Sequence, residues 1–571
     1  MKTRVHIKTL VMMVAALMVF GVTKTVSAQR TLTSGGAVTS NKSDQDYSTW
    51  ASNITSYLYE NSNGTLTRVE AMDKTIVIEE YSKSFKLKSS TSIPRELNIF
   101  GGFYAGTDAN YIVFGQSNYS EKSNLEVFRV VKYSKEWKRL GACSLKNCNT
   151  VVPFEAGSLR FAECKDMLYI RTCHKMYTTS DGLNHQANLT MSVDTRNMKV
   201  TDSYSGISNI GYGYVSHSFN QFIQVDGNEL LAVDHGDAYP RSVVLIKYDK
   251  AAGEQTFTGG CESVDLLEFP GAIGANYTGG SVGGFEVSND SYLVVGNYMK
   301  KGKAVRNVFV SVTSKEKFDE DHTKLTYLTN YKTNVTASTP QLVKIDDEKF
   351  MVLWETINEK TWQSNVSYVL IDQNGKKLSE VQTVKGHLSD CQPIVYNKQI
   401  VWYFTSESTP IFCAIPLDGS KAEDGPIAGD IITIGKMEYK ISKCTSNTKT
   451  ATLVEVADEK SKTIKVPDTI KVQGISFQVT EITDYALERC SACTNVTFGK
   501  NIKKMGNNIF SYWNHIKTIT IKSEVLTSVE KYAFEGVSNA KIKVSKNKLT
   551  KYKKLFKNKG LGDKTSIVAY N

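Results

Sequence analysis

The sequence predicts a mainly β protein with two repeating bodies, and three observations support this. Tyr is abundant, at 29 residues, while Pro is scarce, at 10, and that balance favours strands. Up to about residue 420, an apolar strand followed by a polar turn recurs seven times. The seven strands end at Tyr81, Tyr133, Val193, Tyr248, Val312, Ile371 and Leu417, which are 46 to 64 residues apart. After residue 475 the apolar pattern recurs every 23–24 residues instead.

The longer repeat predicts a β-propeller, because a period of about 50 residues matches a four-stranded blade. Strand–tight turn–strand signals precede the recurring strand, for example around 165–166, 226–228 and 397–398. Each blade is therefore expected to contain strands a, b, c and d, with b the most apolar. The last blade supplies only a to c, so an N-terminal strand should complete it and close the ring. Seven blades are predicted over about 55–420, with six as the alternative.

The first 28 residues have the features of a secretory signal. Lys2, Arg4 and Lys8 lie in a basic segment, an apolar run follows over 10–22, and small residues precede a cleavage point after Ala28. The run is too short for a membrane-spanning helix, and no later stretch is long enough to be one. We expect a chain that is secreted or held at the cell surface, with no transmembrane segment in its mature form.

Charge divides the remaining chain into two bodies of opposite sign. Residues 427–571 contain 25 Lys and Arg against 13 Asp and Glu, a net charge of +12, whereas residues 29–426 contain 40 against 45, a net charge of −5. A polar stretch rich in Gly and Pro lies at the junction. The predicted organisation is a signal peptide at 1–28, a leader at 29–54, the propeller at 55–420, a linker at 421–428 and the repeat domain at 429–571.

Histidine and acidic residues gather where the b–c and d–a connections are expected to emerge on one face of the propeller. Loops on a rigid scaffold commonly bind ligands. The candidate ligand-binding residues are His174, His185, His217, Asp234, His235, Asp237, Tyr239, Arg241, Trp362, His387 and Asp390. Bracing of loops by hydrogen bonds, a metal site, and general acid–base chemistry are the alternative roles for this cluster.

Catalytic and cofactor motifs are absent from the sequence. There is no nucleophile elbow, no His-Glu-x-x-His, no phosphate-binding loop and no EF-hand loop. We therefore predict no catalytic residue, metal ligand or cofactor. Ten cysteines permit disulfides in an exported protein without establishing them; Cys143 and Cys148 are the closest plausible pair.

The shorter repeat can be aligned from residue 482 onward. The apolar positions of the first copy recur at 509–519 and again at 533–542; in the first copy they are Ala486, Leu487, Cys490, Cys493 and Val496. The pattern resembles the BspA-type leucine-rich repeat over about 475–545, preceded by a flank of strands. In that alignment Cys490 fills the family's own cysteine position and Cys493 a leucine position, so both are expected to be buried in the core and not to form a redox or zinc pair. Trp513 and Val537 replace the cysteine in the later copies.

The resemblance implies a stacked solenoid, with strands at 496–498, 519–521 and 542–544 on one face, in a bacterial cell-surface protein that contacts other macromolecules. A lysine-rich C-terminal segment follows, containing Lys541, Lys543, Lys546, Lys548, Lys551, Lys553, Lys554, Lys557 and Lys559 and no acidic residue. It is interpreted as the solvated cap of the solenoid or as a patch for an anionic cell-wall polymer. Nucleic acid is not an expected partner.

Three function classes follow from the sequence. The first is a binding or adhesion protein that recognises an extracellular protein or glycan. The second is a secreted hydrolase or lyase acting on glycans or peptides, with its site on the loop face of the propeller. The third is a passive envelope component whose repeats pack against neighbours. The two binding-type repeats and the missing catalytic motifs favour the first.

Overall fold

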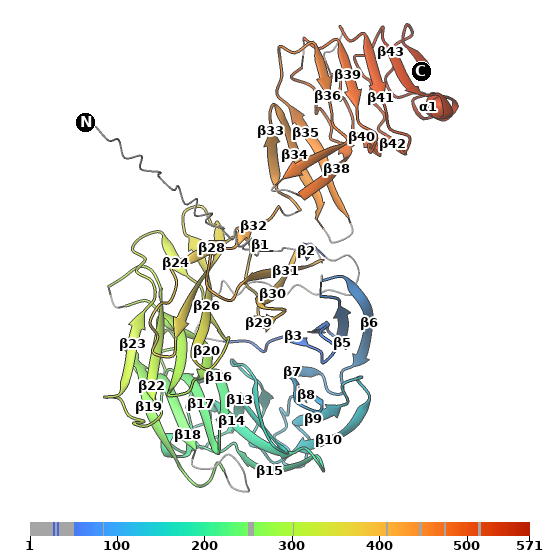
Figure 1. Ribbon diagram of the computed structural model, residues 1–571. Helices are drawn as coiled ribbons and strands as arrows, with labels where there is room; N and C mark the ends of the chain where they lie inside the picture. Colours follow the sequence, from blue (N-terminus) through green and yellow to red (C-terminus); the bar gives the residue numbers. More distant parts are fainter. Residues whose placement is uncertain are drawn as a thin grey trace, which may run out of the picture.

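The computed structural model describes residues 27–28, 31–32, 51–83, 85–248, 256–300, 302–406, 409–426, 428–444, 448–472, 475–490, 492–511 and 515–570. Seven antiparallel sheets form a ring, and a stack of short strands follows it (Figure 1). Most of the predicted signal and leader, and Trp513, lie outside the described residues. The fold is the mainly β propeller and solenoid that the sequence predicts, with seven blades.

Each of the first six blades is built from consecutive strands, and the predicted hairpins form. The blades are β3 (Ser56–Glu60), β4 (Leu66–Ala71), β5 (Thr75–Tyr81) and β6 (Leu87–Pro94); β7 (Ile99–Ala105), β8 (Asn110–Gly115), β9 (Phe128–Tyr133) and β10 (Arg139–Leu145); β11 (Val152–Pro153), β12 (Arg160–Cys164), β13 (Met167–Thr178), β14 (Asn184–Asp194) and β15 (Lys199–Tyr204); β16 (Ser218–Asp226), β17 (Glu229–Gly236), β18 (Ser242–Tyr248) and β19 (Cys261–Glu268); β20 (Gly280–Val287), β21 (Ser291–Tyr298), β22 (Asn307–Ser314) and β23 (Thr323–Tyr327); β24 (Val335–Ala337), β25 (Gln341–Lys344), β26 (Lys349–Asn358), β27 (Ser364–Asp372) and β28 (Gln382–Val384). A 3-10 turn, η1 (Ile210–Tyr212), lies between the third and fourth blades.

The b strands are the most deeply buried because neighbouring blades cover both of their faces. Every residue of β8 and β21 is buried. Trp354 on β26 and Trp402 on β30 (Gln399–Ser406) are fully buried between blades. Burying such large apolar side chains provides most of the free energy that holds the ring together.

The seventh blade is completed from the N-terminal end of the chain. It consists of β29 (Ile394–Tyr396), β30, β31 (Thr409–Pro416) and the two-residue strand β2 (Thr31–Leu32), which pairs with β31 in register Thr31↔Phe412 and Leu32↔Ile411. This confirms the predicted closing strand, although β2 comes from the stretch expected to be a leader. Nearby, β1 (Ser27–Ala28) pairs with β32 (Glu423–Asp424).

Hydrogen bonds tie neighbouring blades together close to their inner strands. Thr55 N donates to Asp390 Oδ2 at 2.8 Å, so the seventh blade is joined to the first. Further ties are Asn53 to Phe100 O, Ser158 to Asn220, Asn220 to Val282 O, Ser281 to Thr339, and Gln341 to Ser389 O. These bonds satisfy polar groups that the apolar blade faces cannot.

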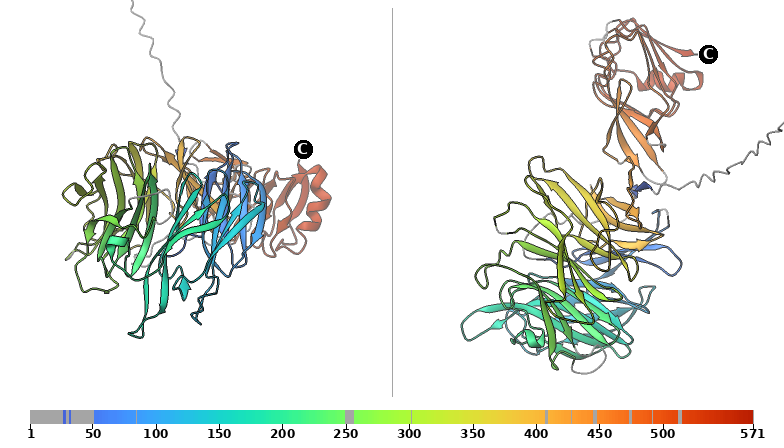
Figure 2. Two further views of the ribbon diagram at one scale, coloured as in Figure 1. Left: turned by 90° about the horizontal axis from the view of Figure 1, so that it is seen from below. Right: turned by 60° about the vertical axis from the view of Figure 1, so that its left-hand side comes forward.

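The C-terminal part is a solenoid of parallel strands (Figures 1 and 2). Ile464, Val496, Ile519, Ile542 and Ile567 stand side by side on five successive strands, so one turn adds one rung to the sheet. These strands are β36 (Thr463–Lys465), β39 (Asn495–Phe498), β41 (Thr518–Ile521), β43 (Lys541–Ser545) and β44 (Ser566–Tyr570); a second sheet holds β33 (Ile431–Ile434), β34 (Met437–Cys444), β35 (Lys449–Val456), β37 (Thr469–Val472), β38 (Ile475–Ile482), β40 (Lys504–Met505) and β42 (Ser528–Val529).

The repeat positions form the core of the solenoid. Phe498, Phe510, Phe534 and Phe556 lie in sequence along its axis, with ring centroids 5.0 to 6.1 Å apart. Cys490 and Cys493 are buried, and burial raises the pKa of the Cys490 thiol to about 12, as suits an inert core thiol. Helix α1 (Leu549–Leu555), preceded by the 3-10 turn η2 (Lys546–Lys548), covers the last turn through buried Tyr552.

Candidate functional site

The b–c and d–a connections emerge together on one face of the ring, here called the loop face. Among the described propeller residues, ten large hydrophobic side chains are exposed, and eight of them lie in these connections: Tyr119, Leu183, Ile207, Tyr212, Tyr239, Ile273, Tyr277 and Trp362. The other two are Leu140 on β10 and Leu378 in a c–d turn. Side chains carried by loops on one face of a rigid scaffold are well placed to contact a partner.

A polar corner lies on this face at the fourth blade, where four of the predicted residues meet. His217 Nδ1 lies 3.0 Å from Asp237 Oδ1; His217 is about one-third exposed, at 32%, and Asp237 is fully buried. Arg241 donates to Asp237 O at 2.7 Å and to Ala275 O at 2.8 Å, which fixes the loop that carries exposed Tyr277. Tyr239 is exposed beside this pair.

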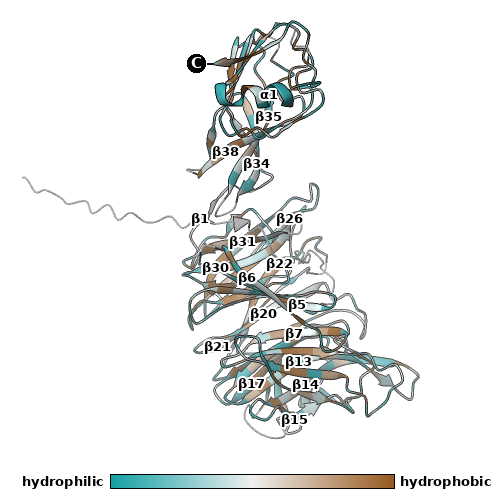
Figure 3. Cartoon of the chain, turned by 90° about the vertical axis from the view of Figure 1, so that its right-hand side faces the viewer, coloured by the Kyte–Doolittle hydropathy of each residue, from teal (hydrophilic) through white to brown (hydrophobic). Residues whose placement is uncertain are grey.

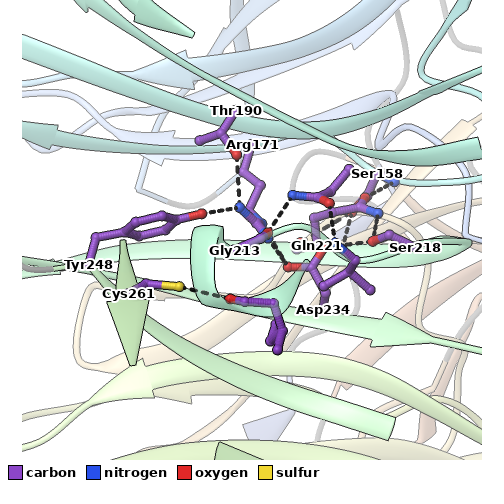
Figure 4. Close-up of polar contacts among 12 residues, drawn as sticks. Ser158, Arg171, Thr190, Gly213, Ser218, Gln221, Asp234, Tyr248 and Cys261 are labelled. Atoms are coloured by element: carbon purple, nitrogen blue, oxygen red, sulfur yellow. Dashed lines mark hydrogen bonds and ion pairs between the residues drawn. The ribbon is translucent and has the colours of Figure 1, made fainter. Parts of the chain in front are cut away.

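Asp234 has a different role from the corner residues, although it lies only three positions before Asp237. It is fully buried and accepts a 2.7 Å hydrogen bond from Arg171 Nε and a 2.6 Å bond from Ser218 Oγ. Arg171 also donates to Thr190 Oγ1, Tyr248 OH and Gly213 O, and Gln221 extends the network through Ser218 (Figure 4). Burial raises the pKa of the Asp234 carboxyl, against the opposing effect of Arg171. This network joins the third blade to the fourth.

Two of the predicted histidines are inside the fold, which corrects their expected loop positions. His174 lies within β13 and His235 within β17, because both b strands extend further than the sequence pattern suggested. Each is buried beside a hydroxyl: Thr150 Oγ1 lies 2.6 Å from His174, and Thr278 Oγ1 lies 2.9 Å from His235. Burial lowers the pKa of both to about 3, so both are neutral braces near neutral pH.

The other predicted residues are spread around the ring. His185 was also expected between strands b and c, but it lies near the start of strand c, β14, 3.0 Å from Asp181. His387 lies 3.4 Å from buried Glu355 on the sixth blade. Trp362 is 76% exposed in the b–c turn of the sixth blade. Asp390 binds Thr55 and Ser56 and so belongs to the ring closure. Across the described residues, no three His, Cys, Asp or Glu side chains are placed to hold a metal ion.

The predicted lysine patch covers the end of the solenoid. Lys541 and Lys543 lie on β43, and seven more lysines lie on η2, α1 and the residues that follow. Figure 3 shows much of α1 in the colour of hydrophilic residues. Within the described part of the chain, none of the nine forms an ion pair, so their charge is available to an anionic partner.

Sequence reasoning missed a cavity on the opposite face, here called the blade 1–2 slot. Its volume is about 770 Å³, and it lies between the first two blades. Tyr59 and Trp137 line it together with hydroxyl, amide and carboxylate groups. The turns at 81–85 and 133–137 share Tyr-Ser-Lys followed by an aromatic residue two positions on, a pattern that marks the turn position of Trp137 but not the cavity.

Comparison with known proteins identifies the solenoid. Residues 463–563 match the BspA type Leucine rich repeat region in six copies, which confirms the resemblance seen in the sequence. No curated protein matches the chain. No helix in the described ranges is long and apolar enough to cross a membrane.

Three solved structures that resemble the chain share little of its sequence. A leucine rich cell surface protein from Faecalibacterium prausnitzii A2-165 shares 16% identity over 25% of this chain and 33% of its own, with a TM-score of 0.15. This chain therefore spans about a third of the length of that protein. A structure from an analysis of two prolyl endopeptidases shares 8% identity over 90% of this chain and 86% of its own, with a TM-score of 0.38. The uncharacterized protein lmo1340 from Listeria monocytogenes EGD-e shares 8% identity over 61% and 89%, with a TM-score of 0.33. At such TM-scores none of these likenesses bears on function.

Proposed function

We propose that this is a secreted or surface-held bacterial binding protein, active in adhesion, whose loop face recognises an extracellular protein or glycan. The observation that carries the proposal is the collection of eight exposed hydrophobic side chains on that face. Exposed Tyr and Trp residues are frequent binding hot spots, because they offer a large apolar area at a low cost in conformational entropy. The predicted signal peptide and the BspA-type repeats support a location at the cell surface.

The test uses the full chain and a loop-face variant, Tyr239→Ala/Tyr277→Ala/Trp362→Ala. Both are passed over immobilised extracellular glycans and matrix proteins, and retention is measured. The variant should bind at least about tenfold more weakly. Leu378→Ala is the matched control, since it removes an exposed hydrophobic side chain from the other face. Equal retention of the triple variant and the control would exclude the loop face as the binding surface.

A secreted hydrolase or lyase is the second candidate, and the His217–Asp237 pair favours it. A buried carboxylate that orients a partly exposed imidazole is a common arrangement for a general base. Incubating the full chain with glycans and peptides and weighing the products separates the two functions. Product masses that disappear in the His217→Gln variant would favour the enzyme; unchanged masses with retained ligand would favour binding.

The lysine patch is proposed as a contact for an anionic cell-wall polymer. Nine lysines and no acidic residue over 541–559 give this segment a strong positive charge. Attraction between exposed charges is screened by salt. Retention on teichoic acid should therefore fall as salt rises, and Lys551→Glu/Lys553→Glu/Lys554→Glu should abolish it. Retention that is independent of salt would contradict this role.

A further inference from the structure

The blade 1–2 slot opens on the face of the a–b and c–d turns, away from the loop face. One wall is the first blade, in which Tyr59, Thr67, Glu80 and Ser89 stand side by side on its four strands. Only Tyr59 among these four is large and aromatic. The outer strand, β6, is rich in Ser and Thr and largely exposed, so the slot is also open at its outer edge.

The opposite wall carries an aromatic platform. Trp137 stacks on Phe103 with ring centroids 5.5 Å apart and an interplanar angle of 24°. Its backbone φ of +66° and the hydrogen bond from its amide to Ser134 O at 3.0 Å hold it in a tight turn. Phe103 also contacts Tyr59, at 5.8 Å between centroids. The indole is therefore held in place before any ligand arrives.

Side chains fill the corresponding space between other pairs of blades. Phe85 occupies in the first blade the turn position that Trp137 occupies in the second, and it is buried against Phe412 at 5.0 Å between centroids. Between the fourth and fifth blades, Lys247 has the position of Glu80; its ammonium lies 4.5 Å from the Phe318 ring centroid and 2.8 Å from Glu262. At the blade 1–2 slot Lys135 lies further from the aromatic ring, 6.0 Å from the Tyr59 centroid, and about 770 Å³ stays open.

We propose that the blade 1–2 slot binds an uncharged oligosaccharide. Besides Tyr59, seven of its lining residues carry hydroxyl or amide side chains, which both donate and accept hydrogen bonds as sugar hydroxyls do: Asn61, Ser62, Asn63, Thr67, Ser89, Thr91 and Thr107. The apolar face of a sugar ring packs on the Trp137 indole, and the carboxylates accept hydrogen bonds from the ligand's hydroxyls. A cavity of this size with a few directed polar groups is typical of small-ligand sites.

The charge of the slot favours an uncharged oligosaccharide over an anionic ligand and over a basic peptide. The slot carries four acidic residues, Glu60, Glu80, Asp108 and Glu136, against Lys135, a formal charge of −4 + 1 = −3 that opposes phosphate, sulfate and uronate groups. Basic peptides are disfavoured because two lysines of the chain already lie near the Tyr59 ring and the Glu80 carboxylate. Lys135 lies 6.0 Å from the Tyr59 ring centroid and donates to Gly106 O, and Lys88 pairs with Glu80 at 3.0 Å.

The test is calorimetric titration of the full chain with neutral oligosaccharides of glucose, mannose, galactose and N-acetylglucosamine. Trp137→Ala should weaken binding about fivefold or more, because it removes the stacking platform. Thr91→Tyr, on the exposed strand β6, should block the slot without touching the core. Leu378→Ala is the matched control: it removes an exposed hydrophobic side chain from a turn of the sixth blade, outside both the slot and the loop face, and should leave the affinity unchanged.

Three results would overturn the proposal. The first is that the folded full chain, verified by its melting curve, binds none of the four neutral sugars. The second is that binding survives both Trp137→Ala and Thr91→Tyr unchanged. The third is that oligolysine or polygalacturonate competes for the slot more strongly than the neutral sugars. The slot and the loop face lie on opposite faces, so either proposal can fail without the other.

Discussion

Replacing Asp234 with Asn removes the carboxylate that faces the buried guanidinium of Arg171. The three neutral partners of Arg171, namely Thr190, Tyr248 and Gly213 O, remain, and Asn can still accept the bond from Ser218. What is lost is the charge pairing at 2.7 Å, with both side chains fully buried. Leaving a buried charge uncompensated costs about 3–5 kcal/mol, so the propeller should lose that much unfolding free energy.

Guanidinium unfolding followed by tryptophan fluorescence measures this loss, because Trp354 and Trp402 are fully buried in the propeller. Asp181→Asn is the control. It removes the charge from an exposed pair with His185, in which Asp181 is 51% exposed, and should be far less destabilising than Asp234→Asn.

A double variant isolates the charge effect. Arg171→Met/Asp234→Leu removes both charges and should be less destabilising than Asp234→Asn alone. If Asp234→Asn unfolded within about 0.5 kcal/mol of Asp181→Asn, the reasoning from the buried ion pair would be refuted.

Two further outcomes are expected. Burial lowers the pKa of His174 and His235 to about 3, whereas in the unfolded chain they bind protons below about pH 6.5. The unfolded state therefore binds more protons than the folded state. The unfolding free energy should fall as the pH drops from about 6.5 towards 3, by up to about 1.4 kcal/mol per pH unit for each histidine. His235→Gln should flatten the plot of unfolding midpoint against pH, and an unchanged slope would count against a buried neutral His235. Tyr552 is fully buried and its hydroxyl donates to Ser523 O at 2.8 Å, so Tyr552→Ala should cost the solenoid about 3–5 kcal/mol. Hydrogen exchange should then speed up in β41 and β43 while the propeller's unfolding midpoint stays fixed, and Lys553→Ala should change neither.

The architecture could be predicted because it repeats. Seven strand ends at regular spacing, each after a tight turn, specify blades, and the missing strand of the last blade required a partner from elsewhere in the chain. The solenoid followed from a shorter period with apolar residues at fixed positions. Both periods are local properties of the sequence, and each repeat needs only its neighbours to bury its apolar face.

The candidate site was harder to predict because it depends on where strands end and which side chains are small. His174 and His235 appeared to lie in loops, yet β13 and β17 continue past them and carry them inside. The blade 1–2 slot arises from small residues at Thr67 and Ser89, where a larger side chain would have filled the space. No local pattern marks a cavity, since it depends on side chains from two blades.

The ring closure has a consequence for the order in which the protein is made. Blades one to six are contiguous in sequence, so each can form as soon as its own strands have been synthesised. The seventh cannot, because β31 is the last strand of the propeller to be made and its partner β2 lies ahead of the first blade in the sequence, and Asp390 must likewise meet Thr55. Until then β31 presents an unpaired edge, which is a hazard for aggregation. A fragment that starts at residue 50 lacks β2, and one that stops before residue 409 lacks β31, so each should leave the ring unclosed.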